Sequence, residues 1–360
     1  MLFTTFLFLL QHVTWGVALP LEARNYSTWM RDLPDELKEI PLKELAIPGS
    51  HNSGAFWLDA TGPLASDQPK LIKQYVAQVP HLARGIVKMY SITQHLDVLG
   101  QLRTGVRVLD IRAAYLNGDF YVYHGFYGKK LAYVLQQVDT FLDENPGEVV
   151  FFGMNRRLDF TRQHIVEVAR FVNDTFAGKL FPPPVNEPFN VALNDVLREG
   201  GQILMFFDVP GSFPFWPLDS IYSPWNNVVA PDLLISKLNH MFDSTKADKF
   251  NNFQAILSPT EEYIAKNMLG NLKQLVTPGN LAVSDWLDGI YENCGSTMVT
   301  NRNVTMLSTD FVGDENEVPS KVFRLNKLKQ FGGCSGCSDG NLLFHVPLLL
   351  MLLLIVCSSV

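Results

Sequence analysis

Short segments rich in β-branched and aromatic residues recur along the chain, and between several of them apolar residues repeat with helical spacing. Residues 131–142 have apolar side chains at i, i+3, i+4 and i+7, and Asn145-Pro146-Gly147 ends that pattern. Residues 161–176 follow the same spacing. Strands that alternate with helices predict a parallel sheet with helical crossovers. The predicted strands are residues 43–47, 106–111, 119–123, 148–153, 202–207, 253–257 and 304–307.

The number of these units favours a barrel. About seven or eight strand–helix units fit a closed TIM-type (β/α) barrel better than an open sheet. Periodicity alone leaves closure undecided, so an irregular or incompletely closed barrel stays within the prediction. Residues 25–330 contain no repeat and no low-complexity linker, which predicts one α/β domain.

The composition of the chain argues against one kind of binding partner. Apolar residues make up 47% of the 360 residues, enough for a large core. The net charge is −7, and the 29 Lys and Arg residues are dispersed along the chain. Without a basic block, the sequence argues against nucleic-acid binding.

The first 18 residues predict a signal peptide. Residues 2–10 form an apolar core, and small residues around Ala18 provide a cleavage site. The alternative is a buried first helix. A signal peptide would direct the chain into the secretory pathway.

Residues 331–360 predict membrane attachment. A stretch of small and polar residues precedes an apolar tail, which is the pattern of a GPI-attachment signal. The attachment residue would be Gly332, Gly333 or Ser335. The alternative is a C-terminal membrane helix. Either attachment predicts a protein on the extracellular face of the plasma membrane.

Three glycosylation sequons agree with that location, at Asn25, Asn173 and Asn303. In an oxidising exterior, Cys294 and Cys334 could form a disulfide, with a local Cys334–Cys337 link as the alternative. No second Cys or His pair stands at zinc-ligand spacing, so no metal site is predicted.

Polar side chains stand at the ends of the predicted strands, where parallel barrels place their active sites. Any one of them alone is most simply a turn residue, a salt-bridge partner or a helix cap. Two histidines with an arginine suggest acid–base chemistry on a phosphodiester, because one imidazole can remove a proton, the other can donate one, and a guanidinium can hold the phosphate. The residues at strand ends are His51, Asn52, Asp110, Arg112, His124, Asn155, Arg156, Arg157, Asp208 and Asp310.

Four motifs, "LAIPGSHNSGAF", "TGVRVLDIR", "YVYHG" and "DENPGEVVFFGM", together resemble the X-domain of phosphatidylinositol-specific phospholipase C. The similarity is greatest to the short X-domain-only proteins and the metal-independent bacterial enzymes, and covers roughly residues 30–315. It implies an irregular TIM-type barrel. It also implies cleavage of phosphatidylinositol or a related glycolipid to diacylglycerol and a cyclic inositol phosphate.

The resemblance assigns a role to each central residue. His51 resembles the general base that deprotonates the inositol 2-hydroxyl, and His124 resembles the general acid. Arg112 resembles the arginine that holds the phosphate in metal-free members, so neither calcium nor another cofactor is expected. Asp310 resembles the aspartate that orients the base, and Asp110 resembles a carboxylate that organises Arg112 or the 2-hydroxyl.

One position departs from the bacterial pattern. Asn52 stands where bacterial members have an Asp that supports the acid, and Asn cannot stabilise a charged imidazole as a carboxylate does. The alternative prediction is therefore a weak or inactive surface protein that binds lipid or protein. A phosphodiesterase acting on a different lipid is a third possibility, which Arg112 disfavours. Asn52, Asn155, Arg157 and Asp208 are predicted to contact the substrate by position alone.

Aromatic residues follow two of the predicted strands and suit a membrane interface. The alternative is that these loops fold back and cover the barrel. The residues concerned are Phe56, Trp57, Phe213, Phe215 and Trp216.

Overall fold

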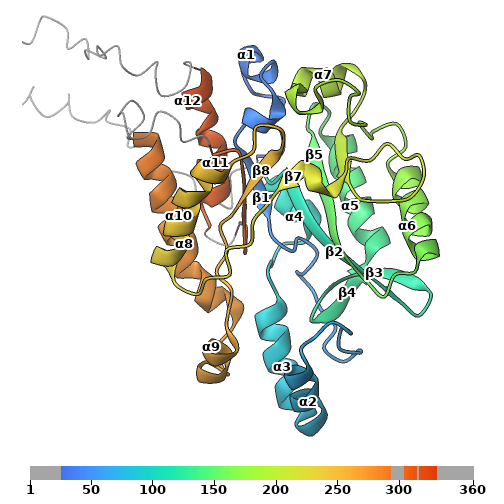
Figure 1. The fold of residues 1–360 in the computed structure, drawn as a ribbon, viewed down its shortest axis with the longest axis vertical. Helices are drawn as coiled ribbons and strands as arrows, with labels where there is room; N and C mark the ends of the chain where they lie inside the picture. Colours follow the sequence, from blue (N-terminus) through green and yellow to red (C-terminus); the bar gives the residue numbers. More distant parts are fainter. Residues whose placement is uncertain (1–25, 293–303, 314–315, 331–360) are drawn as a thin grey trace, which may run out of the picture.

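The computed structural model describes residues 26–292, 304–313 and 316–330 of the chain, which form a curved parallel sheet with helices around it (Figure 1). Seven parallel strands lie in the order β6-β5-β2-β1-β9-β8-β7. Within the described residues no ladder joins the edge strands β6 and β7, so the barrel is incompletely closed. The prediction of an irregular TIM-type barrel is confirmed. The strands are β1 (Ile47–Ser50), β2 (Val108–Leu116), β5 (Val150–Leu158), β6 (Ile203–Phe206), β7 (Ile221–Tyr222), β8 (Phe250–Gln254) and β9 (Met306–Thr309).

Helices follow most strands, and the predicted helix over residues 131–142 is α5. The predicted strand at 43–47 begins only at Ile47, because residues 42–44 form a 3₁₀ turn. The α-helices are α1 (Asp35–Lys38), α2 (Lys70–Gln78), α3 (Pro80–Ser91), α4 (Val98–Arg103), α5 (Leu131–Glu144), α6 (Arg162–Thr175), α7 (Leu193–Arg198), α8 (Pro231–Ser244), α9 (Glu261–Lys266), α10 (Leu272–Glu292), α11 (Val318–Arg324) and α12 (Asn326–Gln330); the 3₁₀ helices are η2 (Leu42–Glu44), η3 (Pro188–Asn190) and η4 (Leu218–Ser220).

One predicted barrel strand has a different role. Residues 119–124 form β3 (Asp119–His124), which runs antiparallel to β2 and pairs with β4 (Phe126–Lys130). The reason is the turn Asn117-Gly118, where φ is +50° and +87°. An Asn-Gly pair with both φ positive closes a two-residue hairpin rather than a helical crossover. The prediction that 119–123 is a parallel barrel strand is therefore wrong.

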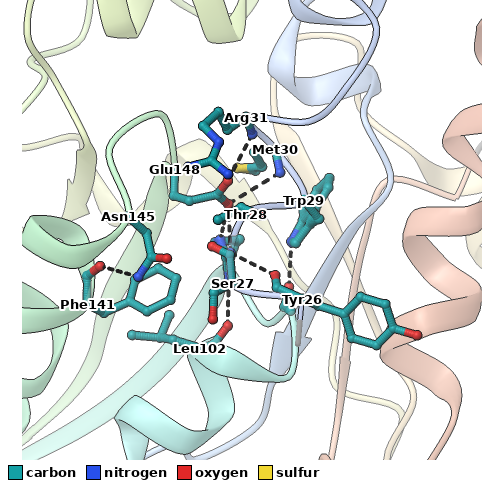
Figure 2. Close-up of polar contacts among 12 residues, drawn as sticks. Tyr26, Ser27, Thr28, Trp29, Met30, Arg31, Leu102, Phe141, Asn145 and Glu148 are labelled. Atoms are coloured by element: carbon teal, nitrogen blue, oxygen red, sulfur yellow. Dashed lines mark hydrogen bonds and ion pairs between the residues drawn. The ribbon is translucent and has the colours of Figure 1, made fainter. Parts of the chain in front are cut away.

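A buried ion pair lies at the amino ends of the strands. Arg107, just before β2, donates from Nε and Nη2 to Glu148 Oε2 at 2.8 and 2.6 Å, and both side chains are fully buried. Glu148 in turn accepts from the backbone N–H groups of Met30 and Arg31 (Figure 2). Arg107 Nη2 also donates to the Ser27 carbonyl. Burial lowers the pKa of Arg107 and raises that of Glu148, and each partner opposes the shift of the other. Through these contacts the pair holds residues 26–31 against the end of the barrel that is opposite to the carboxyl ends of the strands.

No helix in the described part of the chain is both long enough and apolar enough to span a bilayer.

Candidate active site

His51 and Asp310 form the centre of the site. Each residue directly follows its strand, β1 or β9, and these strands are parallel neighbours with Ser50 opposite Thr309. His51 Nδ1 lies 2.8 Å from Asp310 Oδ1, and both side chains are buried. Burial raises the pKa of Asp310, and the nearby His51 and Arg112 oppose that shift.

Arg112 determines which His51 nitrogen carries the proton. Its Nη2 lies 3.3 Å from His51 Nε2. A guanidinium can only donate hydrogen bonds, so Nε2 is the acceptor and Nδ1–H donates to Asp310. Burial lowers the pKa of Arg112, with Asp110 opposing the shift. His51 is thus held in the tautomer that a general base at Nε2 requires.

His124 lies at the end of β3. Its Nδ1 is 2.7 Å from the Ser91 carbonyl, which can only accept, so neutral His124 also carries its proton on Nδ1. Burial, reinforced by the positive charge of Arg112, lowers the pKa of His124 to about 3. The imidazole is therefore uncharged at neutral pH.

Asp110 hydrogen-bonds to the wall of the site and also stabilises the charge of Arg112 electrostatically. Its Oδ2 accepts from the backbone N–H of Asn52 at 3.1 Å, and its Oδ1 accepts from Asn155 Nδ2 at 2.6 Å. No Asp110–Arg112 ion pair forms in the described structure. Asp110 thereby holds the turn that follows β1 against β5.

These side chains surround one cavity of about 530 Å³ at the carboxyl ends of the strands. A volume of this size suits a lipid headgroup or another small ligand. Among its lining residues are His51, Asp110, Arg112, His124, Asn155, Arg156, Trp225 and Asp310.

Arg156 and Arg157 point to opposite sides of β5. Arg156 pairs in register with Arg112 across the β2–β5 ladder, at a bulge between Ile111 and Arg112, so both side chains lie on the cavity side. Arg157 Nη1 instead donates to the Asp208 carbonyl, and Asp208 Oδ1 caps the backbone N–H of Leu218. Neither Arg157 nor Asp208 lines the cavity. The cavity lining does not support the prediction that these two residues contact substrate. Arg157 faces away from the cavity because neighbouring strand residues point to opposite sides, and Asp208, after β6, accepts from the backbone N–H of Leu218.

Asn52 also differs from its predicted position. Its side chain is buried with neither polar atom hydrogen-bonded, and His124 uses Ser91 as its partner instead. The backbone of Asn52 has φ +42°, a conformation that Asn tolerates better than most residues. The Asn52 carbonyl accepts from Thr93 Oγ1, and Asn52 does not line the cavity.

The aromatic loop residues mostly fold inward. Trp216 is fully buried and donates from Nε1 to the Phe181 carbonyl, and Phe215 is buried in the main core. The prediction that these two residues contact lipid is wrong, because they close the core beside β6. Phe56 and Phe213 are partly buried against the same core. Only Trp57 is well exposed, at 43%, with Lys129 Nζ 4.3 Å from its ring centre.

Several site residues had no signal of their own in the sequence. The Trp225 ring centre lies 5.2 Å from that of His51, and Trp225 follows the two-residue strand β7, which is too short for a periodic pattern. The Ser91 carbonyl is a backbone group at the end of α3 and could not be predicted from residue type. The pairing of Arg112 with Arg156 depends on a bulge that only the sheet reveals.

Other predicted positions lie outside the described residues: the signal peptide at 1–18, Asn25, Asn303, Cys294, Cys334, Gly332, Gly333, Ser335 and the tail. Asn173 lies on α6 and is partly exposed.

Comparison with known proteins assigns the family. No protein-family model matches the chain. The mouse PI-PLC X domain-containing protein 2 is 30% identical over 322 residues, which cover 86% of this chain and 90% of the mouse protein. The chain belongs to the PI-PLC X domain-containing proteins. The human PI-PLC X domain-containing protein 3 is 28% identical, with 83% of this chain and 92% of that protein covered.

Solved structures of bacterial enzymes share the fold of this family member. The phosphatidylinositol-specific phospholipase C of Listeria monocytogenes matches with a TM-score of 0.61 at 18% identity, over 84% of this chain and 98% of that chain. A Staphylococcus aureus phosphatidylinositol-specific phospholipase C matches with a TM-score of 0.58 at 17% identity, over 84% and 97% of the two chains.

Proposed function

We propose that the chain is a phosphodiesterase that cleaves phosphatidylinositol-type lipids to diacylglycerol and a cyclic inositol phosphate. The observation that carries the proposal is the meeting of His51, Arg112 and His124 around one cavity, with Asp310 bonded to His51. Family membership and the shared fold support it.

The attack begins at His51. The substrate's inositol 2-hydroxyl would replace Arg112 as the hydrogen-bond partner of Nε2, and Nε2 takes the hydroxyl proton as the oxygen attacks phosphorus. The resulting imidazolium is stabilised by Asp310, which already accepts from Nδ1–H. Arg112 then holds the phosphate oxygens and offsets the charge that develops on them.

Departure requires a proton from His124. As the phosphorus–oxygen bond to diacylglycerol breaks, His124 Nε2–H protonates that oxygen, and the cyclic phosphate and diacylglycerol leave. Burial is the main cause of the low pKa of about 3 at His124, and the positive charge of Arg112 lowers it further. A bound phosphodiester anion that offsets the charge of Arg112 would raise the pKa of His124 and favour uptake of this proton. Substrate binding would then load the general acid.

The test is release of cyclic inositol phosphate from phosphatidylinositol vesicles in the presence of EDTA. Wild type should be active, and His51→Ala and His124→Ala should each lose at least about 10²-fold in rate. Full activity in either variant contradicts the mechanism. Loss of activity with EDTA that calcium restores contradicts the proposal that no metal takes part.

A second candidate is a surface protein that binds lipid or protein with weak or no turnover. The low pKa of His124 and the unpartnered side chain of Asn52 favour it, because no carboxylate helps His124 to take up a proton. Vesicle binding by the wild-type chain without product over hours would favour this candidate. Asn52→Asp would then be expected to increase turnover.

We also propose that the chain enters the secretory pathway through residues 1–18 and is attached to the extracellular face of the plasma membrane by a GPI anchor. The apolar h-region, the small-residue attachment site and the apolar tail support this. Truncation before Gly332 should release the protein into the medium. Release of a protein that lacks the apolar tail by a GPI-cleaving enzyme would indicate an anchor, whereas retention of the full-length chain in the membrane fraction would indicate a spanning helix.

A further inference from the structure

The segment that leaves the end of α3 is bonded to both histidines of the candidate site. The Ser91 carbonyl is the partner of His124 Nδ1 at 2.7 Å. Three residues later, Gln94 Nε2 donates to the His51 carbonyl at 2.9 Å and to the Thr309 carbonyl at 3.1 Å. One short segment therefore connects the ends of β1, β3 and β9.

The Gln94 side chain is fully buried, and each of its polar atoms is hydrogen-bonded. Its Oε1 accepts from the backbone N–H of Val312 at 3.0 Å, while Nε2 faces two carbonyl oxygens. A carbonyl oxygen only accepts and a backbone N–H only donates, so turning the amide over would break all three bonds. Gln94 is thus a link of fixed orientation between the two strand ends.

His51 needs such a link because the strand pairing stops beside it. The β1–β9 ladder ends with Ser50 opposite Thr309, and the His51 N–H donates to the Thr309 carbonyl at 3.0 Å. The next residue, Asn52, has φ +42°, so the backbone turns away from the sheet directly after His51. Gln94 holds the His51 carbonyl and the Thr309 carbonyl together at this point.

Side-chain amides also hold the backbone of Asp310. Asn280 Nδ2, on α10, and Asn316 Nδ2, before α11, donate to the Asp310 carbonyl at 3.0 and 3.1 Å. The N–H of Phe311 donates to the Thr93 carbonyl at 2.8 Å, within the segment after α3. The residues on both sides of the His51–Asp310 bond are therefore fixed by groups from outside β1 and β9.

We infer that Gln94, Asn280 and Asn316 are positioning residues, which hold His51 and Asp310 in the geometry that proton transfer requires. None of the three lines the cavity, so they act through the backbone of the site and not on the substrate. The inference rests on the proposed function, which gives the two side chains a reaction to share. A misplacement of about 1 Å can reduce a rate by about 10²-fold, so the expected effect on kcat is large.

A matched glutamine separates positioning from the simple need to satisfy buried carbonyls. Gln137 on α5 is also buried and makes three hydrogen bonds: Oε1 accepts from the Val98 N–H, and Nε2 donates to Asp97 Oδ2 and Tyr133 Oη. These partners belong to α4, its N-cap and α5, away from the candidate site. Methionine has nearly the shape of glutamine without the amide, so the same replacement removes the same groups at both positions.

The test measures hydrolysis of a dispersed short-chain phosphatidylinositol, and the free energy of unfolding, for wild type, Gln94→Met and Gln137→Met. Gln94→Met should lower kcat by about 10- to 10²-fold, with KM within about twofold of wild type. Gln137→Met should lose stability but keep the wild-type kcat. A wild-type kcat in Gln94→Met, or an equal loss of kcat in Gln137→Met, would overturn the inference.

Proton NMR gives a second readout that does not need turnover. The Nδ1–H of His51, bonded to a buried carboxylate, should give a signal downfield of the backbone amides that is absent in His51→Ala. Gln94→Met should broaden or lose this signal, and Gln137→Met should keep it. If wild type hydrolyses nothing while the signal responds in this way, the proposed function is rejected and the positioning role stands. Hydrolysis by wild type, with kcat and signal unchanged in Gln94→Met, would reject the positioning role alone.

Asn280→Ala keeps the inference testable if Gln94→Met does not fold. It removes one donor to the Asp310 carbonyl, from a partly exposed residue of α10. The variant should lower kcat by about three- to tenfold and shift the His51 signal. A wild-type kcat together with an unchanged signal would overturn the inference.

Discussion

His51 and Asp310 are 259 residues apart in the chain, yet a 2.8 Å hydrogen bond joins His51 Nδ1 to Asp310 Oδ1. The contact follows from the pairing of β1 with β9, which places the residues after both strands side by side. The first and last described strands of the barrel thus supply the two halves of one proton-transfer unit.

Replacing Asp310 tests that unit. Asp310→Asn keeps the shape but removes the charge that stabilises imidazolium at His51, so the rate should fall by about 10³- to 10⁴-fold. Circular dichroism and the free energy of unfolding should show that the fold is kept. Asp208→Asn, at an exposed residue outside the cavity, is the control and should retain the wild-type rate. Equal rates for the two variants would reject a role for Asp310.

The two neighbouring arginines of β5 should behave differently. Arg156→Gln removes a cation from the cavity beside Arg112, so KM for phosphatidylinositol should rise by about three- to tenfold. Arg157→Gln removes a contact to the Asp208 carbonyl and a cation over the Phe207 ring, both outside the cavity, and should leave kinetics unchanged. Steady-state kinetics on the same vesicles measures both. A larger effect at Arg157 would contradict the strand register.

His124 should make the fold sensitive to acid. Its pKa is about 3 in the folded chain against about 6.5 when unfolded, so below pH 6.5 the unfolded state binds the proton more readily. Stability is therefore lost as pH falls, by about 2 kcal/mol between pH 7 and pH 5 from this group. Chemical denaturation at both pH values measures the loss.

The control for this pH effect is His124→Asn, whose amide can still donate to the Ser91 carbonyl. It should lose less stability than wild type on acidification, whereas His81→Asn at an exposed position should follow wild type. An identical pH dependence in His124→Asn and wild type would show that His124 is not held uncharged.

The buried pair at the opposite end of the barrel should dominate stability. Glu148→Gln leaves the guanidinium of Arg107 buried without a counter-charge, so the free energy of unfolding should fall by about 3–5 kcal/mol. Glu144→Gln breaks a half-exposed pair with Arg103 and should cost less than about 1 kcal/mol. Denaturant titration compares the two. A similar small loss in both would mean that water reaches Arg107.

Much of the fold could be predicted from periodicity. The apolar run at 148–153 and the helical spacing of apolar residues at 131–142 match the residues that are buried in the structure. For this reason β5 and α5 form where expected. The direction of β3 differs from the predicted barrel strand, because an apolar segment by itself does not state which way its strand runs. The local sign of the hairpin is the Asn117-Gly118 turn. The two-residue strand β7 is too short to leave any pattern.

Some residues of the site could be predicted from the sequence, and others could not. Residue types at strand ends, together with the motifs around them, pointed to His51, Arg112, His124 and Asp310, and the structure gathers these four at one cavity. In the structure Arg156, and not the predicted Arg157, lines the cavity. Trp216 is buried, and exposed apolar side chains lie on α2 and α3 instead.

The amino-acid sequence by itself determined the elements, the family resemblance and the chemical groups available at strand ends, since these depend on local spacing and residue type. Only the tertiary structure decided which of those groups meet, which arginine enters the cavity and which aromatics are covered. The physical reason is that strand register, a single bulge and the packing of distant segments orient side chains, and these depend on contacts between residues far apart in the chain.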